Sequence, residues 1–227
     1  MTRPPLIVEP PPDLRRRVLE AVGKEPVLPR PEGTRRRAAI LALGFGAMIA
    51  QTLAISLPKT RGRPLGYVEV LVVVWSLVAV LATWAGVVRG RSMLGRPLRW
   101  RLATTVLTPL VLLATWIPVT MYWPQTLSDA STPIRHAGCV LGTFALAAGP
   151  LVAFFRLRRR SDPVHPWLTG AAIGTAAAAW GAMAMPLVCG FTSPLHMILG
   201  HLLPVILIAG LGGALGERLV ALRSPAR

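Results

Sequence analysis

Two cysteines and three histidines are the residues of this chain best suited to chemistry in an apolar setting. Cys139 and Cys189 are its only cysteines, and His136, His196 and His201 lie near them in the sequence. Thiolates and imidazoles bind soft and borderline metal ions, and two thiols can join as a disulfide under oxidation. The cysteines are some 50 residues apart, so any joint chemistry depends on the elements that carry them.

Long apolar runs supply those elements. The hydrophobic fraction is 53%, and each of six runs is close to the roughly 20 residues that a membrane-spanning helix needs. None alternates with the period of a strand, which favours helices over a barrel. The sequence therefore predicts an all-α polytopic membrane protein, with a six-helix transmembrane domain over 38–216 and a cytoplasmic tail over 217–227. The predicted spans are 38–57, 67–88, 102–122, 136–155, 167–189 and 195–215.

The basic residues predict how the bundle is oriented. With the N-terminus inside, the inner segments carry 21 of the 25 Lys and Arg residues, and the outer loops carry the other four. This positive-inside bias predicts a multi-pass protein with both termini in the cytoplasm. Topology and contact with anionic membrane lipids then explain the net charge of +16, so we expect no direct nucleic-acid binding.

This orientation brings the two cysteines to one side of the membrane. The predicted fourth span runs inward from the outer surface and the fifth returns to it, so Cys139 and Cys189 lie at similar depth. His136 precedes Cys139 by three residues on the same helix face, and His196 follows Cys189 across a short outer loop. His201 is about 140° around an ideal helix from His196, so these two histidines should not share a face well.

Three interpretations of the cysteines remain open from the residues alone. They are inert small hydrophobic side chains in a packed core, or they form a disulfide when oxidised, or they bind a soft or borderline metal ion with His136 and His196. His165, on the inner loop before the fifth span, is by itself a solvated loop histidine. It is an accessory candidate together with His201.

Small residues and prolines predict how the spans pack. The fifth span is nearly smooth and should lie inside the bundle, and Pro204 should kink the sixth. Glycines four residues apart should let helices approach closely. These pairs are Gly138 with Gly142, Gly170 with Gly174, and Gly212 with Gly216.

The spans offer little for catalysis or transport. Glu69 and Glu217 lie near the ends of their spans, and no carboxylate lies near a span centre. There is no P-loop, HExxH or GxSxG motif. We therefore expect neither an enzyme nor a bound cofactor. A small membrane transporter or channel without a regulatory partner is the alternative function.

Residues 1–37 form a polar head before the first span. Asp13 is a good N-cap for a short helix over 13–23, in which Leu14 and Val18 begin an apolar stripe at helical spacing. A helix of about three turns is not stable alone in water, so we expect it to fold against a soluble partner, with the membrane surface as the alternative. The predicted partner-binding residues are Asp13, Leu14, Arg15, Val18, Leu19 and Val22.

A family resemblance enters with the second half of the chain. The run 162–172, Trp180-Gly181, Cys189, Gly200-His201 and a glycine-rich final helix resemble the NrsF-type family of six-span membrane anti-sigma factors. The resemblance is strongest over 136–216. Many relatives have Pro-Glu after the second cysteine, whereas this chain has Gly-Phe.

The resemblance implies a regulatory function. A protein of this type lies in the bacterial inner membrane, holds an ECF-type sigma factor there through its N-terminal helix and releases it on an envelope signal. In the family, a cysteine of the fourth span and another at the end of the fifth are linked to sensing of heavy metals or oxidants, and these map onto Cys139 and Cys189. Because this chain lacks the Pro-Glu pair, its signal can differ from that of the relatives, and light-generated stress is a further candidate.

Overall fold

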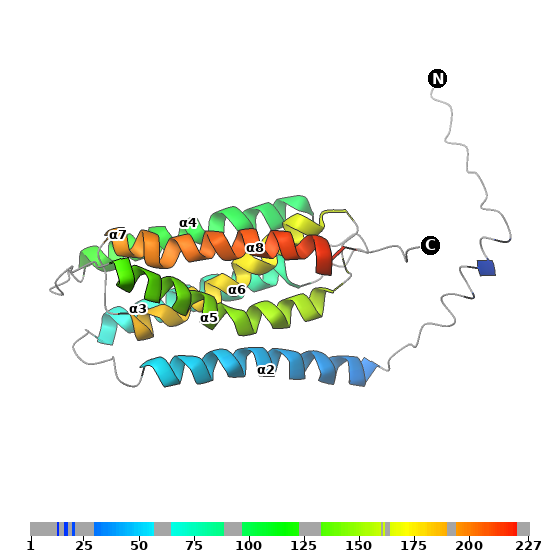
Figure 1. The fold of residues 1–227 in the computed structure, drawn as a ribbon, viewed down its shortest axis with the longest axis horizontal. Helices are drawn as coiled ribbons and strands as arrows, with labels where there is room; N and C mark the ends of the chain where they lie inside the picture. Colours follow the sequence, from blue (N-terminus) through cyan, green and yellow to red (C-terminus); the bar gives the residue numbers. More distant parts are fainter. Residues whose placement is uncertain are drawn as a thin grey trace, which may run out of the picture. The chain divides into compact units, whose positions relative to one another are not determined.

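The structure is a computed structural model of the whole chain. It describes residues 13, 16, 17, 20, 30–56, 65–88, 97–122, 133–159, 161, 164–189 and 194–221. These residues are almost entirely helical, and none of them forms a strand (Figure 1). The elements are α2 (Arg30–Ser56), α3 (Leu65–Gly86), α4 (Leu98–Tyr122), α5 (Pro133–Arg158), α6 (Pro166–Val188), α7 (Pro194–Met197), the π-helix η1 (Ile198–Leu202) and α8 (Leu203–Leu219).

The predicted all-α architecture is confirmed. Six helices are long and apolar enough to cross a membrane, and α7, η1 and α8 together make the sixth, Pro194–Leu219. The first helix begins at Arg30, earlier than the predicted start at residue 38. Pro31 lies in its first turn, where a proline is tolerated because the N–H it lacks has no partner within the helix.

The chain divides into two compact units, residues 1–37 and residues 38–227. In the first unit, the described residues of the predicted partner-binding helix are helical and exposed: Asp13, Arg16, Arg17 and Glu20. The other predicted partner-binding residues lie outside the described residues: Leu14, Arg15, Val18, Leu19 and Val22. Their contribution to an apolar stripe stays a prediction.

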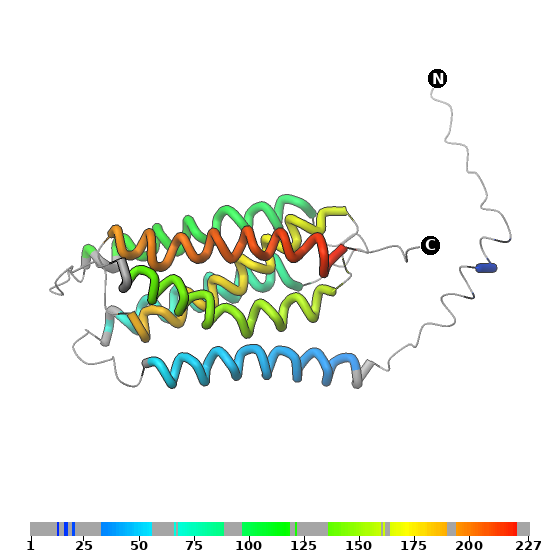
Figure 2. Tube along the Cα trace, in the orientation of Figure 1, coloured from blue at the N-terminus to red at the C-terminus, as the bar shows by residue number. Residues whose placement is uncertain are grey.

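In the second unit, α6 is the central helix, as its smooth sequence predicted (Figure 2). Of its span 89% is buried, whereas the other five spans are 11% to 44% buried. The reason is composition, because alanine and glycine make up most of the buried surface of α6 and leave room for neighbours on every side. Helices α3, α4, α5 and α8 all contact it.

Backbone atoms of α6 and α8 come into direct contact at four glycines. A Cβ atom added to Gly212 would lie 2.8 Å from the Cα atom of Gly174, and one added to Gly170 would lie 2.6 Å from the Cα atom of Gly216. The close approach predicted for these two glycine pairs is confirmed. The same prediction is wrong for Gly138, because no described residue lies within 4 Å of where its side chain would be.

Indole groups tie α3 to its neighbours. Trp75 Nε1 donates to Thr115 Oγ1 on α4 at 3.0 Å, and Trp180 Nε1 on α6 donates to Thr83 Oγ1 at 2.9 Å. A polar group in an apolar medium needs such a partner. These hydrogen bonds therefore fix the rotation of α3 against α4 and α6.

An irregular turn precedes Pro204, where a kink was predicted. Residues Ile198–Leu202 form a π-helix, and the N–H of Leu203 donates to the carbonyl of Ile198, five residues back. Pro204 has no N–H with which to continue the regular pattern of an α-helix. The wide turn is thus the local form that the helix takes beside this proline.

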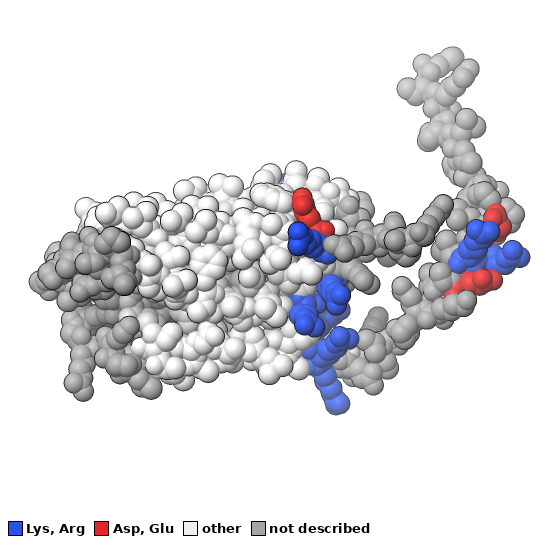
Figure 3. All heavy atoms as spheres, viewed as in Figure 1, with Lys and Arg blue, Asp and Glu red and all other residues white. Residues whose placement is uncertain are grey.

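Within the described residues, basic side chains gather at one end of the bundle. Arg156, Arg158 and Arg159 lie at the end of α5, Arg218 lies at the end of α8, and Arg99 lies at the start of α4. Figure 3 shows basic side chains gathered at one end of the helices. We call this the basic end. The opposite end, where α5 begins and α6 ends, we call the thiol end.

Replacing Gly212 with alanine should test the backbone contact. The added methyl group would meet Gly174, and overpacking of this kind costs about 1 to 3 kcal/mol. Gly212→Ala should therefore lower the melting temperature of the detergent-solubilised protein by several degrees. Gly210→Ala, on the same helix with open space around it, is the control and should not lower it. Equal melting temperatures for the two variants would contradict the tight contact.

Candidate functional site

The two cysteines meet at the thiol end. Cys139 lies in the second turn of α5 and Cys189 directly follows α6. The Cys139 thiol donates a hydrogen bond to Cys189 Sγ over 3.4 Å. A disulfide needs the two sulfur atoms at about 2.0 Å, so a modest shift of α5 or α6 separates the thiol form from a bonded one.

Two histidines of the sixth span complete the cluster. Cys189 Sγ lies 3.2 Å from His196 Nε2, and the His196 and His201 rings are 5.2 Å apart between centroids. The expectation that these histidines do not share a face is wrong. It assumed a regular α-helix, whereas the π-helix η1 has a wider turn that brings residues five apart onto one face.

The ligand atoms of four residues lie within 4.8 Å of one another: Cys139, Cys189, His196 and His201. The structure thus brings together both predicted cysteines and two of the four accessory histidines. His136 is outside this group, and its ring lies against that of His196 with centroids 4.9 Å apart. His165 precedes α6 at the basic end, a helix length away from the thiols.

The surroundings of Cys189, one residue beyond the span, favour its thiolate. The hydrogen bond from Cys139 lowers the pKa of the Cys189 thiol, and the nearby rings of His196 and His201 act in the same direction. Burial acts against them by raising that pKa. The thiolate is the form of cysteine that reacts with oxidants and binds metal ions.

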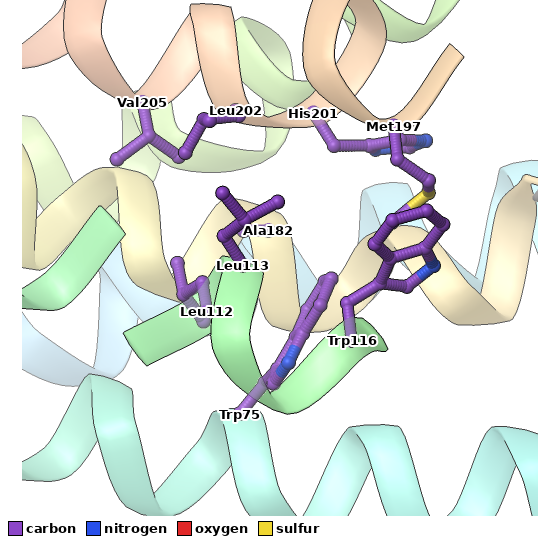
Figure 4. Close-up of a pocket in the computed structure, with 9 residues that line it drawn as sticks. All are labelled: Trp75, Leu112, Leu113, Trp116, Ala182, Met197, His201, Leu202 and Val205. Atoms are coloured by element: carbon purple, nitrogen blue, oxygen red, sulfur yellow. The ribbon is translucent and has the colours of Figure 1, made fainter. Parts of the chain in front are cut away.

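Two small cavities adjoin the cluster. The larger, of about 20 Å³, is lined by His201, Met197 and the two indoles Trp75 and Trp116, and Figure 4 shows these side chains around it. The smaller, of about 10 Å³, is lined by Cys189 as well as His201. Organic ligands occupy pockets of about 300 to 1,000 Å³, so these spaces suit at most a water molecule or an ion.

Sequence reasoning missed two neighbours of this site. Met185 and Met197 line the cavity beside Cys189, and thioether sulfur is a soft group like the thiols. Met185 lies four residues before Cys189, one helical turn away. That spacing was the available signal. Met197 is recognisable only once the η1 turn is known.

Oxidation should link the two cysteines within one chain. The sulfur atoms are already in contact, so diamide, which takes two electrons and two protons from a thiol pair, should form the disulfide quickly in the folded protein. The measurement is the loss of two maleimide-reactive thiols per chain, reversed by a reductant. Cys139→Ser should keep one reactive thiol under the same treatment. Dimers linked between chains would contradict an intramolecular pair.

Comparison with known proteins identifies the family. A model of the family described as NrsF, negative regulator of sigma F, matches residues 21–221. The match covers all six spans and the four residues of the cluster. No curated protein and no solved structure matches the chain. The resemblance seen in the sequence is therefore confirmed, and the chain belongs to the NrsF family of negative regulators of sigma F.

Proposed function

We propose that this protein is a membrane-bound anti-sigma factor that sequesters an ECF-type sigma factor through its N-terminal head and releases it on an envelope signal. The observation that carries the proposal is the family match over residues 21–221. The six long apolar helices fit a multi-pass membrane protein. A negative regulator fixed in a membrane can act by keeping its sigma factor away from RNA polymerase.

The head is the proposed binding element for the sigma factor. Leu14, Val18 and Val22 would lay one apolar stripe into a groove of the partner, which is a common way for a short helix to be recognised. Arg16 and Arg17 are exposed and would face acidic groups at the rim of that groove, where charge steers association. Folding against the partner would supply the stability that so short a helix lacks alone.

The basic end is proposed to face the cytoplasm of a bacterial inner membrane. Arginines concentrate there in the described residues, and the positive-inside rule assigns such an end to the cytoplasmic side. Both termini would then be cytoplasmic, where a sigma factor is found. Contact of the same arginines with anionic lipids would hold the bundle at its depth.

The thiol pair is the proposed sensor. Metal binding at Cys139 and Cys189, or their oxidation, would draw α5 and α6 together. The oxidising signals considered include light-generated stress. The loop between these helices is tied to the end of α8, because Ser161 N–H donates to the Val220 carbonyl at 3.0 Å. We propose that a shift of α5 against α6 passes through this loop, over 156–166, to the head.

Disrupting the apolar stripe should release the partner. Val18→Asp places a charge in the proposed groove, so the sigma factor should no longer co-purify with the detergent-solubilised protein from the native cell. Deletion of residues 1–29, which leaves α2 whole, should have the same effect. Mass spectrometry of the bound proteins makes the measurement.

Glu20→Gln is the matched control on the other face of the same helix. Its partner binding and its membrane insertion should equal those of the unchanged protein. Equal capture of the sigma factor by Val18→Asp would contradict docking through the stripe, and its absence from every sample would contradict the proposed function.

Replacing the thiols should remove the response. The double variant Cys139→Ser with Cys189→Ser keeps the size of both side chains but loses soft-metal binding and disulfide formation. Transcription from a sigma-dependent promoter should stay low on addition of Cd²⁺ or an oxidant, instead of rising as with the unchanged protein. If transcription still rose with every inducer in cells that carry the double variant, the thiols would be excluded as the sensor.

A further inference from the structure

The ring of His201 is buried beside the Cys189 thiol. Its side chain is 5% exposed, and neither ring nitrogen finds a partner among the described residues. Buried polar groups in folded proteins are almost always satisfied, and an unsatisfied one carries its full desolvation cost. An imidazole held this way beside two thiols is suited to bind a metal ion.

The distances among the four side chains of the cluster suit a metal site. Zinc–sulfur and zinc–nitrogen bonds of about 2.3 and 2.0 Å put the ligand atoms of a tetrahedral site roughly 3.3 to 3.8 Å apart. Here the two sulfur atoms are 3.4 Å apart, Cys189 Sγ and His196 Nε2 are 3.2 Å apart, and all four ligand atoms lie within 4.8 Å. Small movements of side chains would bring them onto one ion.

The donor types restrict the ion. Two thiolates and two neutral imidazoles carry two negative charges, so a divalent ion gives a site with no net charge. Charge in apolar surroundings is costly, which disfavours a monovalent ion such as Cu⁺ in this place. Thiolate and imidazole together suit zinc and its heavier relative cadmium, which accept tetrahedral geometry. The 10 Å³ cavity beside Cys189 and His201 leaves no room for an organic ligand.

We propose that Cys139, Cys189, His196 and His201 form a tetrahedral site for one Zn²⁺ or Cd²⁺ ion, with the η1 turn present to supply His201. On binding, each thiol loses its proton to solvent and each sulfur gains a bond to the ion. The set differs from the one that the sequence alone indicates, since His201 replaces His136. The site rests on this geometry, and its part in signalling rests on the proposed function.

Co²⁺ is the probe for coordination in the unchanged protein. Full-length protein in detergent is reduced with a phosphine, stripped with a chelator and titrated with Co²⁺. A tetrahedral site with two thiolates should give intense visible bands, a sulfur charge-transfer band, and one ion per chain by elemental analysis. Zn²⁺ should abolish these bands by displacing Co²⁺. The weak spectrum of an octahedral ion, or no binding, would overturn the proposal without the need for any variant.

Four histidine variants test which residues bind. His196→Ala and His201→Ala should each lose the tetrahedral spectrum, and Zn²⁺ affinity should fall by more than about 100-fold, because even outer partners of metal ligands account for 10- to 100-fold. His136→Ala should keep the spectrum, and His165→Ala at the basic end is the matched control. Loss on His136→Ala with retention on His201→Ala would overturn the assignment.

Failure of the metal site and failure of the proposed function give different results. Elution volume and circular dichroism confirm that each variant is folded. Protein that binds Zn²⁺ but captures no sigma factor contradicts the proposed function and supports the site. Protein that captures the sigma factor but gives no tetrahedral spectrum overturns the site alone.

Discussion

The direct backbone contact between α6 and α8 is the constraint on which the rest of the bundle depends. In a membrane, lipid tails are as apolar as leucine, so helices associate through close packing rather than through the hydrophobic effect. Gly170 and Gly174 on α6 meet Gly212 and Gly216 on α8 with no side chain between them. This contact holds α6 at the centre, where 89% of its span is buried, and fixes the sixth span beside it.

That fixed pair carries three of the four residues of the candidate site. Cys189 directly follows α6, and His196 and His201 precede α8 on the continuous sixth span. Cys139 alone comes from α5, which contacts α6 through Gly181 and the backbone of Thr143. A change in the bonding of Cys139 therefore acts between α5 on one side and the α6–α8 pair on the other. The site is placed where a chemical event can move one helix against two.

The sequence predicted those features that follow from apolar length and charge. Apolar length and charge were enough to predict the six spans and their alternating direction. They were also enough to predict the shared depth of Cys139 and Cys189. It failed where local geometry departs from an ideal helix. His201 was kept as an accessory candidate but left out of the predicted metal ligands because 100° per residue was assumed, although Pro204 three residues later was the signal for an irregular turn. Gly138 misled because glycine spacing does not tell which helix face meets a neighbour.

The glycine contact between α6 and α8 also bears on how a displacement at the thiol end reaches the basic end. Helix α6 is about 35 Å long for its 23 residues, with the thiols at one end and the loop to α5 at the other. A flexible helix pair would absorb a small displacement near Cys189 before it reached Ser161. At these four glycines the two backbones pack directly against each other, so α6 and α8 should respond as one body. Since Ser161 is bonded to the end of α8 at Val220, relative movement of α5 must then be taken up in this loop, at the end where the arginines lie.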